Sequence, residues 1–136
     1  MPQKLVLDAN IFLRYLTNDD PKKANQCEKL FKRTSENKIT LLVTDVCLAE
    51  LIWTLDSYYG LKRDEIVEKV IAILNMEGFE FSNIDLWLET IDRFKKTKVS
   101  FIDAYHAAFT FNSGSTICSY DRDFDIFHDI KRVEPS

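Results

Sequence analysis

The sequence is poor in cysteine and has no long apolar run. Its three cysteines, Cys27, Cys47 and Cys118, lie far apart and include no CxxC pair, so the sequence predicts neither a disulfide framework nor a zinc site. The first apolar strand begins at Lys4, which leaves no room for a signal peptide ahead of it, and no apolar stretch approaches the ~18 residues of a membrane span. These absences predict a cytoplasmic protein that makes no membrane contact.

An excess of positive charge is also lacking. The chain has 18 Lys and Arg against 22 Asp and Glu, a net charge of -4, which argues against a protein that coats nucleic acid by charge alone. Contact with a nucleic acid would therefore be local or metal-assisted. No internal repeat, low-complexity tract or linker interrupts the 136 residues, so we expect a single domain over residues 1–136.

Apolar patterns along the chain alternate between strand and helix. Strands are expected at residues 4–7, 39–43, 79–81, 116–120 and 130–134, and helices at residues 10–16, 21–37, 45–59, 64–77, 84–96 and 100–112. This alternation is typical of an α/β fold with a central, mainly parallel sheet. In such folds ligands bind at the carboxyl ends of the strands.

Four carboxylates follow or interrupt strongly apolar runs, and no obvious Lys or Arg neutralises them: Asp8, Glu50, Asp103 and Asp121. Acidic side chains that are distant in sequence but meet at one edge of a sheet can hold a hard divalent cation. A metal-dependent hydrolase of phosphate esters is therefore the leading interpretation.

Each carboxylate also has a simpler explanation. Asp8, at the end of the first strand, could cap the next helix, and the amide of Asn10 could either cap that helix or orient a ligand. Glu50 is the only charge in VCLAELIWTL, and its helical neighbours offer no cation. We therefore expect an unpaired buried carboxylate, unless a distant Lys or Arg pairs with it.

The two later carboxylates are the more ambiguous ones. Asp103 lies three residues after Ser100, which is the spacing of a capping box. Asp121 opens an acidic stretch, DRDFD, that could be a solvated loop in which Asp123 caps a short helix. We favour Asp121 as the ligand because it lies closest to the strand end, with Ser119 as a supporting hydroxyl and Asp123 in reserve.

In order along the chain, the motifs D-A-N, A-E-L, F-I-D-A-Y-H-A-A and S-Y-D-R-D-F resemble those of the PIN-domain family. The resemblance covers residues 5–127, and a compact chain of this length is most similar to the VapC-type toxins of toxin–antitoxin systems. It implies a three-layer α/β/α fold with a central sheet of about five strands. It also implies an endoribonuclease that depends on Mg²⁺ or Mn²⁺, that is often a homodimer, and that a small cognate antitoxin protein inhibits.

The family's acidic positions correspond here to Asp8, Glu50, Asp103 and Asp121. We expect Asp8 and Asp103 to ligate the metal directly, and Glu50 and Asp121 to bind it through water, complete a second site or position the attacking water. Neither histidine is needed for this chemistry. For contact with the phosphate backbone of RNA the best candidates are Arg14 and Arg122, since each closely follows an acidic motif.

Other functions fit parts of the pattern. An aspartyl phosphatase of the haloacid dehalogenase type needs a second Asp two residues after the first, and this chain has Asn10 there. An RNA-processing PIN nuclease without an antitoxin would carry the same motifs. In a non-catalytic binding module, the acids would be helix caps and surface charges and the apolar helices would dock a protein partner.

Overall fold

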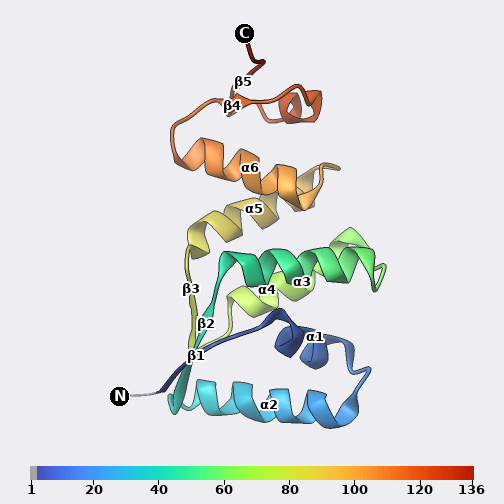
Figure 1. The fold of residues 1–136 in the computed structure, drawn as a ribbon, viewed down its shortest axis with the longest axis vertical. Coiled ribbons are helices and arrows are strands. Elements are labelled where there is room, and N and C mark those ends of the chain that lie inside the picture. Colours follow the sequence, from blue (N-terminus) through green and yellow to red (C-terminus); the bar gives the residue numbers. More distant parts are fainter. Residues whose placement is uncertain (1–2) are drawn as a thin grey trace. The chain divides into compact units, whose positions relative to one another are not determined.

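The computed structural model describes residues 3–136, and the chain divides into two units, Met1–Asn83 and Ile84–Ser136. In the first unit three strands form one sheet, with four helices beside it (Figure 1). The strands are β1 (Gln3–Val6), β2 (Ile39–Val43) and β3 (Phe79–Phe81). The helices are α1 (Ala9–Thr17), α2 (Pro21–Ser35), α3 (Asp45–Ser57) and α4 (Arg63–Leu74).

The sheet of the first unit is parallel throughout, in the order β1-β2-β3. Its central strand β2 alternates as a half-buried strand should, with Ile39, Leu41 and Val43 buried. Phe12 of α1 and Phe31 of α2 pack together, with ring centroids 5.7 Å apart. Since all three strands run the same way, their carboxyl ends lie at one edge, and α1 and α3 begin just after two of those ends.

Helix starts in the first unit follow local capping chemistry. The Asp20 carboxylate accepts a hydrogen bond from the Lys23 backbone N–H at 3.1 Å, and Pro21 occupies the first helical position of α2. Thr44 caps α3 in the same way, because its hydroxyl accepts a hydrogen bond from the Cys47 backbone N–H at 3.1 Å. The fourth helix, α4, begins at Arg63, one residue before the predicted start, and the Glu65 carboxylate accepts a hydrogen bond from the backbone N–H of Lys62 at 3.2 Å.

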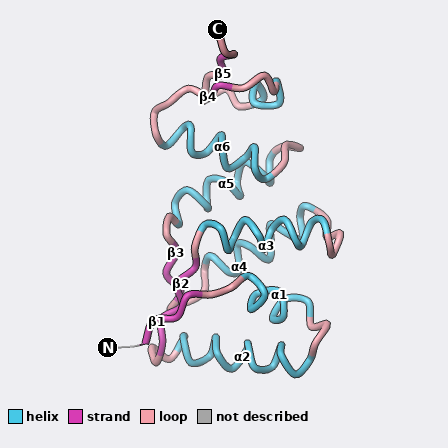
Figure 2. Tube along the Cα trace, viewed as in Figure 1, coloured by secondary structure: helices cyan, strands magenta, loops and turns pink. Residues whose placement is uncertain are grey.

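The second unit is a helical hairpin followed by a short sheet. Helices α5 (Ile84–Lys96) and α6 (Phe101–Asn112) pack on each other, and α5 has the bounds predicted from its apolar stripe. Two short parallel strands follow, β4 (Ile117–Cys118) and β5 (Arg132–Val133), with the 3₁₀ helix η1 (Arg122–Ile126) in the connection (Figure 2).

The α/β class and the parallel strand pairing are therefore confirmed. One central sheet of about five strands is not shown, because the five strands found in residues 3–136 pair as a three-stranded sheet and a two-stranded sheet. No helix of that part of the chain is long and apolar enough to cross a membrane.

Candidate metal centre

Asp103 lies in the first turn of α6, where the Ser100 cap holds it. The Ser100 hydroxyl accepts a hydrogen bond from the Asp103 backbone N–H at 3.2 Å, so the predicted cap is present. The Asp103 side chain is half-buried. Burial raises the pKa of this carboxyl, and the nearby charges of Asp121 and Asp123 raise it further, whereas its hydrogen bond with Ser100 acts in the opposite direction.

Asp121 and Asp123 are exposed and follow β4, with Asp121 directly before η1 and Asp123 in its first turn. The Ser119 hydroxyl accepts the Asp121 backbone N–H at 2.9 Å, and the Asp121 carboxylate accepts the Asp123 backbone N–H at 2.8 Å. Asp121, and not Asp123, is thus the residue that caps the short helix. Ser119 therefore contacts the backbone of Asp121, and this hydrogen bond fixes the turn.

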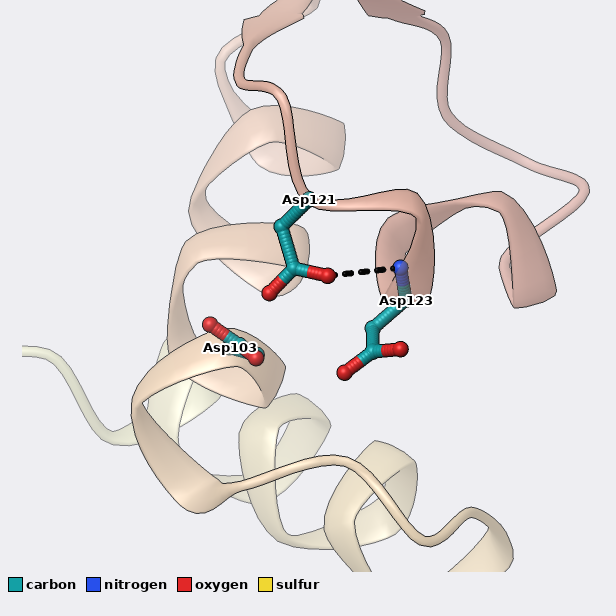
Figure 3. Close-up of side chains that lie close together, drawn as sticks. All are labelled: Asp103, Asp121 and Asp123. Atoms are coloured by element: carbon teal, nitrogen blue, oxygen red, sulfur yellow. Dashed lines mark hydrogen bonds between the residues drawn. The ribbon is translucent and has the colours of Figure 1, made fainter.

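The three aspartates of the second unit form one cluster, in which carboxylate oxygens of Asp103, Asp121 and Asp123 all lie within 4.8 Å of one another. Figure 3 shows Asp103 on its helix facing the turn that carries the other two. Within residues 3–136 none of the three takes part in an ion pair. Carboxylates this close repel one another, and three oxygen donors without a cation suit a hard divalent ion such as Mg²⁺ or Mn²⁺.

Asp8 occupies the N-cap position of α1, but its side chain makes no capping hydrogen bond there. Instead its carboxylate accepts a hydrogen bond from the side-chain amide of Asn10 at 3.2 Å, and both side chains are exposed. The alternative in which Asp8 serves only as a helix cap therefore loses its support. Asn10 holds the carboxylate in place and leaves its other lone pairs available to a ligand.

Glu50 is exposed, so the prediction that it is buried is wrong. The buried positions of α3 occupy one side of the helix, and Glu50 lies outside that arc. In the described part of the chain it forms no hydrogen bond and no ion pair. Burial raises the pKa of Cys47 to about 11, with Asp8 and Glu50 adding to the shift, so both carboxylates act on this one thiol of the first unit.

A comparison with models of protein families identifies the family of this chain. The model of the PIN domain matches residues 5–129, which is nearly the whole chain. The chain belongs to the PIN-domain family. The curated proteins include a relative, the VapC ribonuclease of Aquifex aeolicus (strain VF5), that is 29% identical over 98 residues, or 72% of each chain.

Among solved structures, this PIN domain is similar to the crystal structure of VapBC2 from Rickettsia felis bound to a DNA fragment from their promoter. The TM-score is 0.40 at 14% identity, and the alignment covers 97% of this chain and 98% of that chain.

The two arginines predicted to contact RNA have different surroundings in this PIN domain. Arg14 of α1 is partly buried and donates from Nη1 to the Asp19 carboxylate at 3.1 Å. Arg122 is exposed at the start of η1 and lines a surface pocket of about 280 Å³ together with Lys98 and Asp123. A cation thus lies beside Asp123, a member of the acidic residues of the second unit.

One ion pair of the PIN domain, Arg93 with Asp129, has no sequence signal because its members are 36 residues apart. Arg93 of α5 is buried, and its guanidinium donates to both carboxylate oxygens of Asp129, at 2.9 and 2.5 Å. The guanidinium carbon also lies 5.1 Å from the ring centroid of Phe127. These contacts fasten the segment that follows η1 to α5, and so restrain the turn that carries Asp121 and Asp123.

We expect Asp129→Asn to lower the free energy of unfolding by about 2 kcal/mol near neutral pH, because it removes the carboxylate that accepts two hydrogen bonds from the buried guanidinium and leaves it only the longer contact with Glu89, at 3.4 Å. Chemical denaturation measures the change. Arg93 lowers the pKa of Asp129, so the stabilisation is present above the ordinary Asp pKa of about 3.9 and is lost as pH falls through the lower folded-state value. The difference between the wild type and the variant should therefore narrow below about pH 4.

Asp92→Asn is the matched control on the same helix. Asp92 pairs with Lys96 at 3.0 Å, but both side chains are exposed, so its loss should cost less than about 0.5 kcal/mol. Equal costs for the two variants would mean that the Arg93 pair does not fasten this segment.

Proposed function

We propose that this PIN-domain protein is a Mg²⁺- or Mn²⁺-dependent endoribonuclease that hydrolyses phosphodiester bonds of RNA. The observation that carries the proposal is the group of three carboxylates, Asp103, Asp121 and Asp123, whose oxygens lie within 4.8 Å of one another with no ion-pair partner in residues 3–136. The name of the Aquifex relative, a ribonuclease, supports the same activity.

In this proposal Asp103 and Asp8 are direct ligands of the cation, and Asp121 and Glu50 bind through water or position the attacking water. Asp123 adds a further oxygen donor beside Asp103. A bound divalent cation would polarise the scissile phosphate and lower the pKa of coordinated water. Asn10 keeps the Asp8 carboxylate oriented, and the capped turn at Ser119 keeps Asp121 directed toward Asp103.

We further propose that the protein is the toxin of a VapBC-type toxin–antitoxin pair, acting as a homodimer and inhibited by a small antitoxin protein. Support comes from the order of the acidic motifs and from the VapC name of the relative. We also propose that residues 1–136 form a single domain with a central sheet of about five strands.

Removal of divalent metal should abolish cleavage. The protein is treated with EDTA, dialysed, and incubated with a 5′-labelled single-stranded RNA with and without added Mg²⁺ or Mn²⁺, and products are separated by gel electrophoresis. We expect internal cuts only when the metal is restored, because the carboxylates alone cannot neutralise the phosphate or activate water. Cleavage of equal rate in EDTA would contradict the proposal and would indicate a metal-independent nuclease.

A further inference from the structure

Two pockets of the first unit flank α1 and share two of its side chains, Asn10 and Arg14. The first lies between α1 and α2, has a volume of about 440 Å³, and is also lined by Ile11, Lys23, Gln26 and Leu30. The second lies between α1 and α3, has a volume of about 250 Å³, and is also lined by Asp19, Tyr58 and Tyr59. Because Asn10 and Arg14 line both, the two pockets are neighbours along one surface.

The first pocket has the chemistry of a nucleotide site. Its lining includes two cations, Arg14 and Lys23, and no carboxylate, although the chain as a whole is acidic. The side-chain amides of Asn10 and Gln26 can each donate and accept hydrogen bonds, as the edge of a base requires. Apolar side chains from both helices complete the lining, and the volume falls in the range of about 300–1,000 Å³ that is usual for small-ligand pockets.

The second pocket offers an aromatic surface. Tyr58, at the end of α3, is 78% exposed, whereas its neighbour Tyr59 is held by a 2.8 Å hydrogen bond from its hydroxyl to the Asp19 carboxylate. The two rings meet edge to face, with centroids 4.9 Å apart and an interplanar angle of 78°. Exposed aromatic rings next to cations are the usual platform for the bases of single-stranded nucleic acid.

Arg14 is held between the two pockets by its contact with Asp19. Its Nη1 donates to Asp19 at 3.1 Å, and the Thr17 hydroxyl donates to the same carboxylate oxygen at 3.1 Å. A guanidinium has five N–H donors, so this bond restrains the side chain and leaves donors for an anion. A restrained arginine between two base-sized pockets is placed to bind the phosphate that links two nucleotides.

The pockets also adjoin a residue of the proposed catalytic set. Asn10 lines both of them, and its side-chain amide donates to the Asp8 carboxylate at 3.2 Å. A single-stranded nucleic acid bound in these pockets would therefore pass directly beside Asp8.

We propose that the surface formed by these two pockets, here called the α1 track, binds two consecutive nucleotides of single-stranded RNA. One base enters the pocket of Gln26 and Lys23, the other stacks on Tyr58, and Arg14 contacts the phosphate between them. The choice of RNA as the ligand rests on the proposed ribonuclease function. Binding to the track itself needs no cleavage and can be measured without it.

The test measures the affinity of the full chain for a fluorescein-labelled eight-nucleotide single-stranded RNA of mixed sequence, in EDTA, by fluorescence anisotropy at several salt concentrations. We expect Tyr58→Ala to weaken binding about tenfold through lost stacking, and Tyr58→Phe, which keeps the ring, to bind like the wild type. Lys23→Gln should weaken binding and lower the slope of log K against log salt by about 0.7.

Lys32→Gln is the matched control, since Lys32 is an exposed lysine of α2 that does not line the pocket, and it should leave the slope unchanged. The proposal is overturned if the wild type does not bind the RNA, or if Lys23→Gln and Lys32→Gln have equal effects. It is also overturned if Tyr58→Ala and Lys23→Gln leave RNA binding intact but change self-association in sedimentation, which would indicate a protein interface. This experiment measures RNA binding and not cleavage. A failure of the α1 track proposal can therefore be distinguished from a failure of the proposed nuclease activity.

Discussion

Asp103→Asn should lower divalent-dependent cleavage of RNA by more than about 100-fold, since even residues that only support a metal ligand contribute 10–100-fold. The substitution keeps the shape of the side chain and removes the negative charge that a cation needs. It changes a carboxylate whose oxygens lie within 4.8 Å of those of Asp121 and Asp123. Initial rates of cleavage at saturating Mg²⁺, for protein of verified fold, measure the effect.

The stability of the same variant separates a metal ligand from a helix cap. The pKa of Asp103 is raised by burial and by Asp121, which means that its negative charge is less stable in the folded protein than in the unfolded chain. Without metal, Asp103→Asn should therefore leave the free energy of unfolding unchanged or raise it slightly. A helix cap would behave in the opposite way, with a loss of about 1 kcal/mol.

Asp85→Asn provides the matched control, because Asp85 is an exposed carboxylate in the first turn of α5, as Asp103 is a carboxylate in the first turn of α6. It should cleave like the wild type. Unchanged cleavage in Asp103→Asn, or a fall in stability with no effect on cleavage, would refute the metal site and favour capping.

Local chemistry made much of the fold predictable from the sequence. The caps at Asp20, Thr44 and Ser100 begin helices where the pattern predicted them, because each satisfies free backbone N–H groups with a side chain only three residues away. The convergence of Asp103 with Asp121 could be anticipated as well, since one starts a helix and the other follows a strand. Asp123 joins them because the turn capped by Asp121 folds back on itself.

Features that depend on contacts between distant parts of the chain could not be predicted from the local sequence. Glu50 was predicted to be buried because its neighbours are apolar, yet only one side of α3 is covered, and Val46 and Trp53 are exposed with it. The partner of Arg93 lies 36 residues along the chain, and strand pairing likewise joins residues that are far apart. Local pattern predicts which residues form an element, but not which of its faces another element covers.

Gly78 precedes β3 at a point where the backbone of the first unit leaves no room for a side chain. Its φ is +80°, and a Cβ there would lie 2.5 Å from the backbone oxygen of Thr34 and would also overlap the Thr34 methyl group. Thr34 is fully buried, and its hydroxyl donates to the Leu30 carbonyl, so it cannot move aside without breaking α2. The Gly78 carbonyl in turn accepts the Leu41 backbone N–H at 3.1 Å, which fixes the glycine to β2.

Gly78→Ala should therefore lower the free energy of unfolding by about 4 kcal/mol, of which about 1–2 comes from left-handed backbone strain and the rest from overlap with Thr34. Gly60 and Gly114 make this division measurable, because their φ values are +61° and +65° and no atom lies within 4 Å of a Cβ built on either. Gly60→Ala and Gly114→Ala should cost only the strain, about 1 kcal/mol. Urea denaturation of the three variants tests the difference, and equal costs would mean that Thr34 gives way and that the close approach of α2 to β3 does not constrain the fold.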